Sequence, residues 1–156
     1  MTPFRFVFAL LMVLALSSLA IAQHTITDKE ADEVTQLALT GFWGKAVDEN
    51  NRPIQPKDES ERKTVPIPIA DAHRVARAGV TAGIAIWAEL DWRSYYRAFM
   101  KKERSSGRWS GKQMAFIGLL FGVAQAGTEK SLEDTPRDND GRDRAARMLA
   151  DAQKAL

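Results

Sequence analysis

Apolar residues recur at helical spacing in several segments of the chain, and this pattern predicts an all-α fold. The segments are separated by short polar stretches, and no internal repeat interrupts them. We therefore expect one small domain of four to five helices. The predicted helices cover residues 28–40, 70–90, 92–104, 114–127 and, from about residue 141, the C-terminal segment.

Polar residues at the expected helix starts support these boundaries. Thr27 and Glu30 form the Thr-x-x-Glu pattern of a capping box, and Ser110 and Gln113 form the related Ser-x-x-Gln pattern. In such a box each side chain binds a backbone N–H group that the helix itself leaves unpaired. Asp91 is the expected N-cap of the third helix.

The segment 114–127 is almost entirely apolar, with Gln125 as its one polar side chain. It is too short to span a bilayer, which needs about 20 residues. Because its apolar residues lie all round the helix, we expect a central, buried helix. Small residues line one side of this helix and of the second helix, which predicts close packing between the two. The predicted packing residues are Ala72, Ala76, Gly79 and Gly83 on one helix, and Ala115, Gly118, Gly122 and Ala126 on the other.

Two segments lack helical periodicity. Residues 45–69 form a long, proline-containing loop, in which Asn50-Asn51 suits the turn of a short hairpin. Prolines in the stretch 65–69 remove backbone donors and favour extended structure there. Residues 128–140 are polar and are expected to form an exposed connector.

The first 22 residues have the order of a secretory signal peptide. Arg5 precedes an unbroken apolar run, Val7 to Leu16, and small residues occupy positions 20 and 22. Cleavage after Ala22 would leave a mature domain of residues 23–156. The alternative, an uncleaved anchor, would have a short apolar run for a membrane span.

The composition of the chain indicates a cellular compartment but does not indicate a binding partner. The chain has no cysteine, which rules out disulfides, thiolate metal sites and a lipid anchor on cysteine. Removal of residues 1–22 would lower the formal net charge from +2 to +1, because Arg5 is the one charged residue there. We therefore expect a periplasmic or extracellular protein, and the near-neutral charge argues against nucleic acid as a partner.

Local charge is far from neutral between Asp91 and Lys112. This stretch holds seven basic residues and two acidic ones. Four of the bases share one face of the third helix, beside an aromatic face that includes Tyr96 and Phe99. Arginine next to tyrosine and tryptophan is typical of binding hot spots. The predicted binding residues are Arg93, Arg97, Lys101, Arg104, Arg108 and Trp109. The alternative interpretation is an amphipathic helix with an ordinary solvated face.

Other chemistry has weaker support. The chain has two histidines, His24 and His73, without metal-ligand spacing. Cleavage one residue later would make His24 N-terminal and able to bind copper. Glu89 and Asp91 lie between two tryptophans, where a carboxyl group can act as a general acid. We expect neither a metal nor a cofactor.

Three functions are consistent with these patterns. The first is a non-catalytic binding protein, of the inhibitor, immunity, chaperone or adaptor type, that docks a protein partner, which the basic face suggests is acidic. The second is a protein that binds an anionic membrane or envelope polymer. The third is a small periplasmic enzyme that uses Glu89 or Asp91. The sequence does not predict an oligomeric state.

Overall fold

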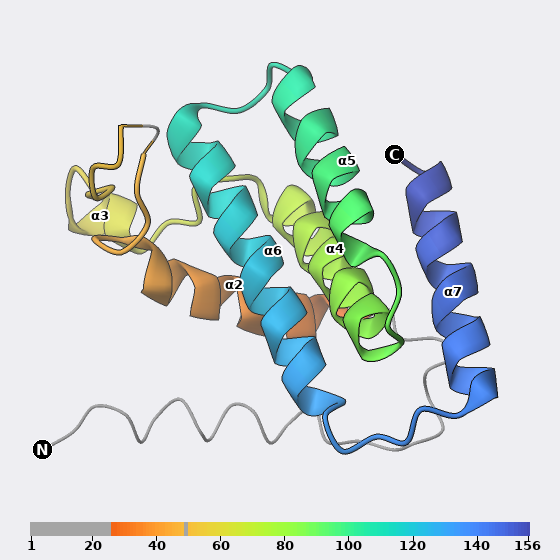
Figure 1. Cartoon of the computed structure of the whole chain (residues 1–156). Helices are drawn as coiled ribbons and strands as arrows, with labels where there is room; N and C mark the ends of the chain where they lie inside the picture. Colours follow the sequence, from red (N-terminus) through yellow and green to blue (C-terminus); the bar gives the residue numbers. More distant parts are fainter. Residues whose placement is uncertain (1–25, 49) are drawn as a thin grey trace, which may run out of the picture.

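Five helices of 14 or more residues and one short helix make up the chain that a computed structural model describes (Figure 1). The description covers residues 26–48 and 50–156, which contain no β-strand. The predicted signal peptide, 1–22, and His24 lie outside these residues. The prediction of an all-α fold is confirmed. The helices are α2 (Asp28–Phe42), α3 (Glu59–Arg62), α4 (Ile69–Trp87), α5 (Trp92–Ser105), α6 (Gly111–Ser131) and α7 (Asn139–Lys154).

The N-terminal caps form where the sequence predicted them. Both capping boxes are complete: Thr27 and Glu30 start α2, and Ser110 and Gln113 start α6. The Asp91 side chain accepts a hydrogen bond from the Ser94 N–H at the start of α5. These contacts span three residues, so the local sequence is enough to determine them.

The central helix is α4, and not the apolar segment 114–127 as we expected. Helix α4 packs against α2, α5, α6 and α7, and its residues 82–85 are buried on every side. Helix α6 packs against α4 and α2 on one side, while Gly122 and Ala126 on the opposite side are exposed. Figure 1 shows α6 and α5 side by side, with α4 behind them. The sequence does not distinguish the buried side of α6 from its exposed side, because the exposed side also carries small and apolar residues.

Glycines on α4 allow a close contact between α4 and α6. A Cβ atom at Gly79 would lie 2.4 Å from the Phe121 carbonyl oxygen, and one at Gly83 would lie 2.6 Å from the Gln125 carbonyl oxygen. No side chain fits in such a space, so the backbones of α4 and α6 approach directly. Ala72 and Ala76 on the same helix are fully buried.

The small residues predicted on α6 do not make this contact, so that part of the packing prediction is wrong. A Cβ at Gly122 would have no atom within 4 Å, and one at Gly118 would meet only Met100 of α5, at 3.7 Å. Ala115 is half-buried. The side of α6 that faces α4 carries larger residues, including Phe121 and Thr128.

Two helix ends differ from the prediction. Helix α6 continues to Ser131, because Thr128 is buried against Gly83 and its hydroxyl donates to the Ala124 carbonyl. The connector between α6 and α7 is therefore 132–138 instead of 128–140. Helix α4 ends at Trp87, before the expected residue 90, because Glu89 adopts a left-handed φ of 60°.

The long segment between α2 and α4 contains more structure than expected. Val47 and Pro53 form an isolated antiparallel bridge, and Asn51 between them has a left-handed φ of 60°. The short helix α3 follows. The Trp43 indole N–H donates to the Arg62 carbonyl at 3.0 Å, which ties the end of α3 to the end of α2. None of the described helices combines the length and apolar character needed to cross a bilayer.

Candidate binding surface

Four of the predicted binding residues form one exposed row on α5. Arg93, Arg97, Lys101 and Arg104 follow each other at intervals of four, four and three residues, and all four are exposed. At this spacing side chains lie one above another on a single helix face. The opposite face is buried through Tyr95, Phe99, Met100 and Glu103. We call Arg93, Arg97, Lys101 and Arg104 the basic row.

The basic row has no carboxylate partner among the residues that the structure describes. None of the ion pairs of this part of the chain, all within 4.0 Å, includes any of the four side chains; Asp91 attracts Arg97 from a longer distance, which contributes to the lowered pKa of Asp91. Arg97 donates to the Ser94 hydroxyl at 3.1 Å, and the Arg93 guanidinium lies over the Trp92 ring at 5.0 Å. Some bases elsewhere are neutralised, as Arg77 is by Asp28 and Lys112 is by Glu61. The positive potential of the row therefore points to solvent.

Aromatic contacts hold α5 in place beneath the row. The Tyr96 and Phe121 ring centroids are 5.0 Å apart, and those of Phe99 and Phe121 are 5.4 Å apart. Such contacts contribute about 0.5–1.5 kcal/mol each beyond the buried area. Because these rings fix the helix against α6, the row is presented by a rigid scaffold, which lowers the ordering cost of binding.

A buried ion pair fixes α5 against α4. The Arg74 guanidinium donates to both oxygens of the Glu103 carboxylate, at 2.7 and 3.0 Å, and to Asp71 at 3.1 Å. Burial alone would raise the pKa of Glu103, but the hydrogen bonds from Arg74 and Trp109 outweigh it and hold the pKa below its usual value. Glu103 is therefore a charged group in the core.

The other two predicted binding residues belong to this ion-pair network and not to the basic row. The Trp109 indole N–H donates to Glu103 at 2.8 Å. The Arg108 guanidinium donates to Asp71 at 3.0 Å and stacks over the Trp109 ring at 4.5 Å. Arg108 and Trp109 thus hold the turn between α5 and α6 against the start of α4. The candidate binding surface therefore consists of the four residues of the basic row, without Arg108 and Trp109.

Sequence reasoning missed Arg74, Asp71 and Glu103. A signal existed for one of them: Glu103 is the one acid on an otherwise basic helix, and it lies four residues after Phe99, on the buried face. An acid at a core position requires a buried cation. Which cation provides it depends on the contact between α4 and α5, and the sequence does not reveal that contact.

The two carboxylates considered for catalysis lie on the surface. Asp91 caps α5, and hydrogen bonds from the Ser94 hydroxyl and backbone hold the pKa of Asp91 below its usual value. A general acid needs the opposite shift. Glu89 forms an ion pair with Arg137 at 3.0 Å and lies 3.9 Å from Arg142. The Arg137 contact ties the 132–138 connector to the end of α4, and the Arg142 contact ties the start of α7 to it.

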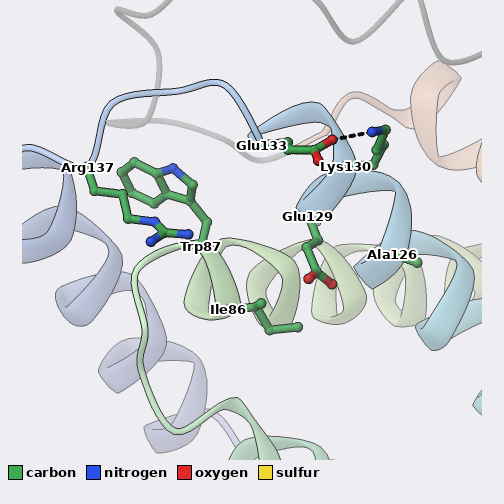
Figure 2. Close-up of a pocket in the computed structure, with 7 residues that line it drawn as sticks. All are labelled: Ile86, Trp87, Ala126, Glu129, Lys130, Glu133 and Arg137. Carbon is green, nitrogen blue, oxygen red and sulfur yellow. Dashed lines mark hydrogen bonds and ion pairs between the residues drawn. The ribbon is translucent and has the colours of Figure 1, made fainter.

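A small pocket of about 260 Å³ lies near this connector (Figure 2). Its walls come from the ends of α4 and α6 and from the connector, with Trp87 as the one aromatic residue. Lys130 and Glu133 in its rim are paired with each other, and Arg137 is paired with Glu89. These three charges are neutralised inside the chain, and Glu129 is the one charged residue of the lining without an ion pair in the described structure.

The described residues hold no group of three side chains suited to a metal ion. His73 is instead part of the contact between α2 and α4: its Nε2 lies 2.7 Å from Asp32, and its Nδ1 lies 3.4 Å from Asp28. The His73 side chain is mostly buried at this contact.

Comparison with protein-family models, with characterised proteins and with solved structures gives no match for this chain. The functional argument therefore rests on the residues themselves.

Proposed function

We propose that the protein is an exported, non-catalytic binding protein that docks an acidic partner protein through the basic row of α5. The observation that carries this proposal is the exposed alignment of Arg93, Arg97, Lys101 and Arg104 without an internal carboxylate partner. Such an array attracts an acidic surface from a distance and raises the association rate.

Repulsion within the basic row lowers the stability of α5, which a solvated face of mixed charge would not do. Arg97 lies four residues from both Arg93 and Lys101, and like charges at this spacing destabilise a helix by about 0.2–0.5 kcal/mol per pair. On α7, by contrast, Arg147 lies four residues from Asp143 and from Asp151. The two helices differ in charge order, which supports a role for the α5 face outside folding.

The two other functions have less support. Catalysis by Glu89 or Asp91 would need a cleft and a carboxyl group with a raised pKa, and the pKa of Asp91 is lowered. An anionic membrane or polymer would also be attracted to the row, so this alternative must be separated by experiment. Export itself is proposed from the order of residues in the first 22 positions.

The test compares two triple variants of equal charge. Arg93→Glu, Arg97→Glu and Lys101→Glu reverse the row. Lys45→Glu, Lys63→Glu and Arg147→Glu reverse three bases elsewhere, all exposed and without ion pairs in the described structure. The mature protein and both variants would be used to capture partners from the envelope fraction of the producing organism, at 50 and 300 mM salt.

We expect the unaltered protein and the matched control to recover the same acidic protein, less strongly at high salt, and the row variant to lose it. Equal recovery by the row variant would contradict the proposal. Salt-sensitive binding to phosphatidylglycerol vesicles with no protein recovered would favour the membrane alternative instead.

A further inference from the structure

The outer face of α6 is an apolar helix face that the described elements cover only in part. Its six residues carry no charge or polar group over about 16 Å of helix. They are Ala115, Gly118, Leu119, Gly122, Val123 and Ala126. Gly122 and Ala126 are exposed, and the other four are half-buried.

Ala115, Leu119 and Val123 pack in part against the core, but the face around Gly122 does not serve packing within the described chain. A Cβ at Gly122 would meet no atom within 4 Å, whereas a Cβ at Gly79 or Gly83 of α4 would collide with the α6 backbone. Glycine in a helix interior lowers stability relative to alanine. The glycines of α4 are compensated by close packing, and Gly122 has no such compensation in the described structure.

The basic row of α5 runs along the edge of this face. The side of α5 that contacts α6 contains Tyr96, next to Phe121, and Met100, next to Gly118. Arg97 and Arg104 lie three residues before and four residues after Met100, so their side chains follow Met100 on the solvent side. An apolar strip and a strip of unpaired positive charge therefore lie next to each other.

We propose that α5 and α6 together form the docking site for one amphipathic helix of the partner protein. Its apolar side, rich in small residues, would lie along α6 at Gly118 and Gly122, and its acidic flank would face Arg97 and Arg104. This inference rests on the proposed function and names the element that the acidic partner presents.

Two features favour a helix over a lipid surface. The largest side chains on the α6 face are Leu119 and Val123, and it has no aromatic residue. Helices that insert into a membrane surface use large side chains such as Trp, Phe and Leu to bury apolar area. Small residues instead let a second helix approach closely, as Gly79 and Gly83 do between α4 and α6. Charge complementarity with the basic row makes one flank of that helix acidic.

Site-specific photo-crosslinking tests this arrangement. The crosslinker p-benzoylphenylalanine would replace Lys101 in the row, Leu119 on the α6 face or, as a control, Arg147 on α7, in the organism that produces the protein. We expect positions 101 and 119 to crosslink to the same segment of one protein. That segment should have Asp or Glu along one flank of a helix and small apolar residues along the next, and position 147 should give no such product.

A pair of glycine variants makes the test specific for the α6 face. Gly122→Leu fills the apolar face, and Gly127→Leu adds the same side chain on another side of α6; a Cβ at either position has open space. We expect Gly122→Leu to lower the crosslink yield from position 101 at least tenfold and Gly127→Leu to change it less than twofold. Circular dichroism would verify that both variants are folded.

The outcomes separate this inference from the proposed function. If position 101 captures an acidic protein that depends on the row while position 119 crosslinks to lipid, to a second copy of the chain or to nothing, the docking site is refuted and the proposed function stands. If Gly122→Leu leaves the yield unchanged, the docking site is likewise refuted. If the variant with the reversed basic row also captures the partner as well as the unaltered protein does, both the docking site and the proposed function are refuted.

Discussion

The Arg74 guanidinium binds both carboxylate oxygens of Glu103, at 2.7 and 3.0 Å, across the contact between α4 and α5. Glu103 is 4% exposed, and its second oxygen also accepts from the Trp109 indole. One buried acid thus joins α5, α4 and the turn before α6. The charged residues of α5 therefore fall into two groups. Glu103 is buried and neutralised by Arg74, whereas the basic row is exposed and forms no ion pair.

Removal of the Glu103 carboxylate should destabilise the fold. Loss of one partner of a buried ion pair leaves the other charge unpaired, which typically costs 3–5 kcal/mol. The Arg74 side chain is 41% exposed and keeps its ion pair with Asp71, so water and Asp71 compensate in part. We expect Glu103→Ala to lower the free energy of unfolding by about 2 kcal/mol in urea titrations. Glu133→Ala, which breaks the exposed pair with Lys130, should change it by about 0.5 kcal/mol or less. Equal losses in the two variants would contradict the buried role of Glu103.

The same ion pair predicts a loss of stability in acid. The pKa of Glu103 in the folded protein lies below its ordinary value of 4.5. The unfolded chain therefore binds the proton more readily, so the ion pair stabilises the fold above about pH 4.5 and this contribution is lost as the pH falls through the lower, folded pKa. The lowered pKa values of Asp28 and Glu61 act in the same direction.

Comparison with Glu103→Gln isolates this contribution. The difference in unfolding free energy between the unaltered protein and Glu103→Gln should be constant from pH 7 to 5 and should shrink between pH 4.5 and 3, as followed by urea titration at each pH. A difference that stays constant down to pH 3 would mean that Glu103 titrates alike in the folded and unfolded chain.

The sequence predicted the features that depend on near neighbours. The capping boxes at Thr27 and Ser110 and the N-cap at Asp91 formed as expected, because each needs partners three residues away. The alignment of the basic row on one helix face could also be predicted, because it depends only on residues three and four positions apart. The length of α6 could not be predicted from the sequence, because Thr128 is helical and buried through its contact with Gly83 of a distant segment.

Burial was the harder property to predict. Ala and Gly carry no polar group and little apolar area, so a face made of them gives no pattern that separates core from surface. The segment 114–127 therefore looked buried all round, although Gly122 and Ala126 are exposed. The α4 glycines look the same in the sequence as Gly118 and Gly122, and only the paired helix distinguishes their roles.

Alanine substitutions at these glycines should have opposite effects. Gly79→Ala and Gly83→Ala would force a Cβ into the α6 backbone and should lower the free energy of unfolding by about 1–3 kcal/mol or more, the usual cost of overpacking. Gly122→Ala meets no atom and should raise stability by about 0.5–1 kcal/mol, the helix preference of alanine over glycine. Urea titrations of the three variants would reveal this difference. A loss at Gly122 as large as at Gly79 would show that the α6 face is packed after all.

Glu89 combines backbone strain with an ion pair, and two substitutions can separate them. Its φ of 60° places it in the left-handed region, while the Leu90 N–H closes the helix end on the Ala85 carbonyl at 2.8 Å. Glycine adopts this conformation without strain, and alanine does not. Both lose the ion pair with Arg137. We therefore expect Glu89→Gly to be about 1 kcal/mol more stable than Glu89→Ala in thermal or urea melts. The reverse order would mean that residue 89 does not hold a left-handed conformation in solution.

The basic row should lower stability through its own repulsion. Arg97 has like charges four residues away on both sides, at Arg93 and Lys101. Arg97→Glu replaces two repulsive pairs with two attractive ones and should raise the free energy of unfolding by about 0.5–1 kcal/mol at 20 mM salt. The gain should fall sharply at 1 M salt, where the screening length is about 3 Å. Arg147→Glu on α7 is the opposite case, because it places a third acid between Asp143 and Asp151, and it should lower stability at low salt. If Arg97→Glu were destabilising at low salt, the row would support the fold and its unpaired charge would no longer be an argument for a partner.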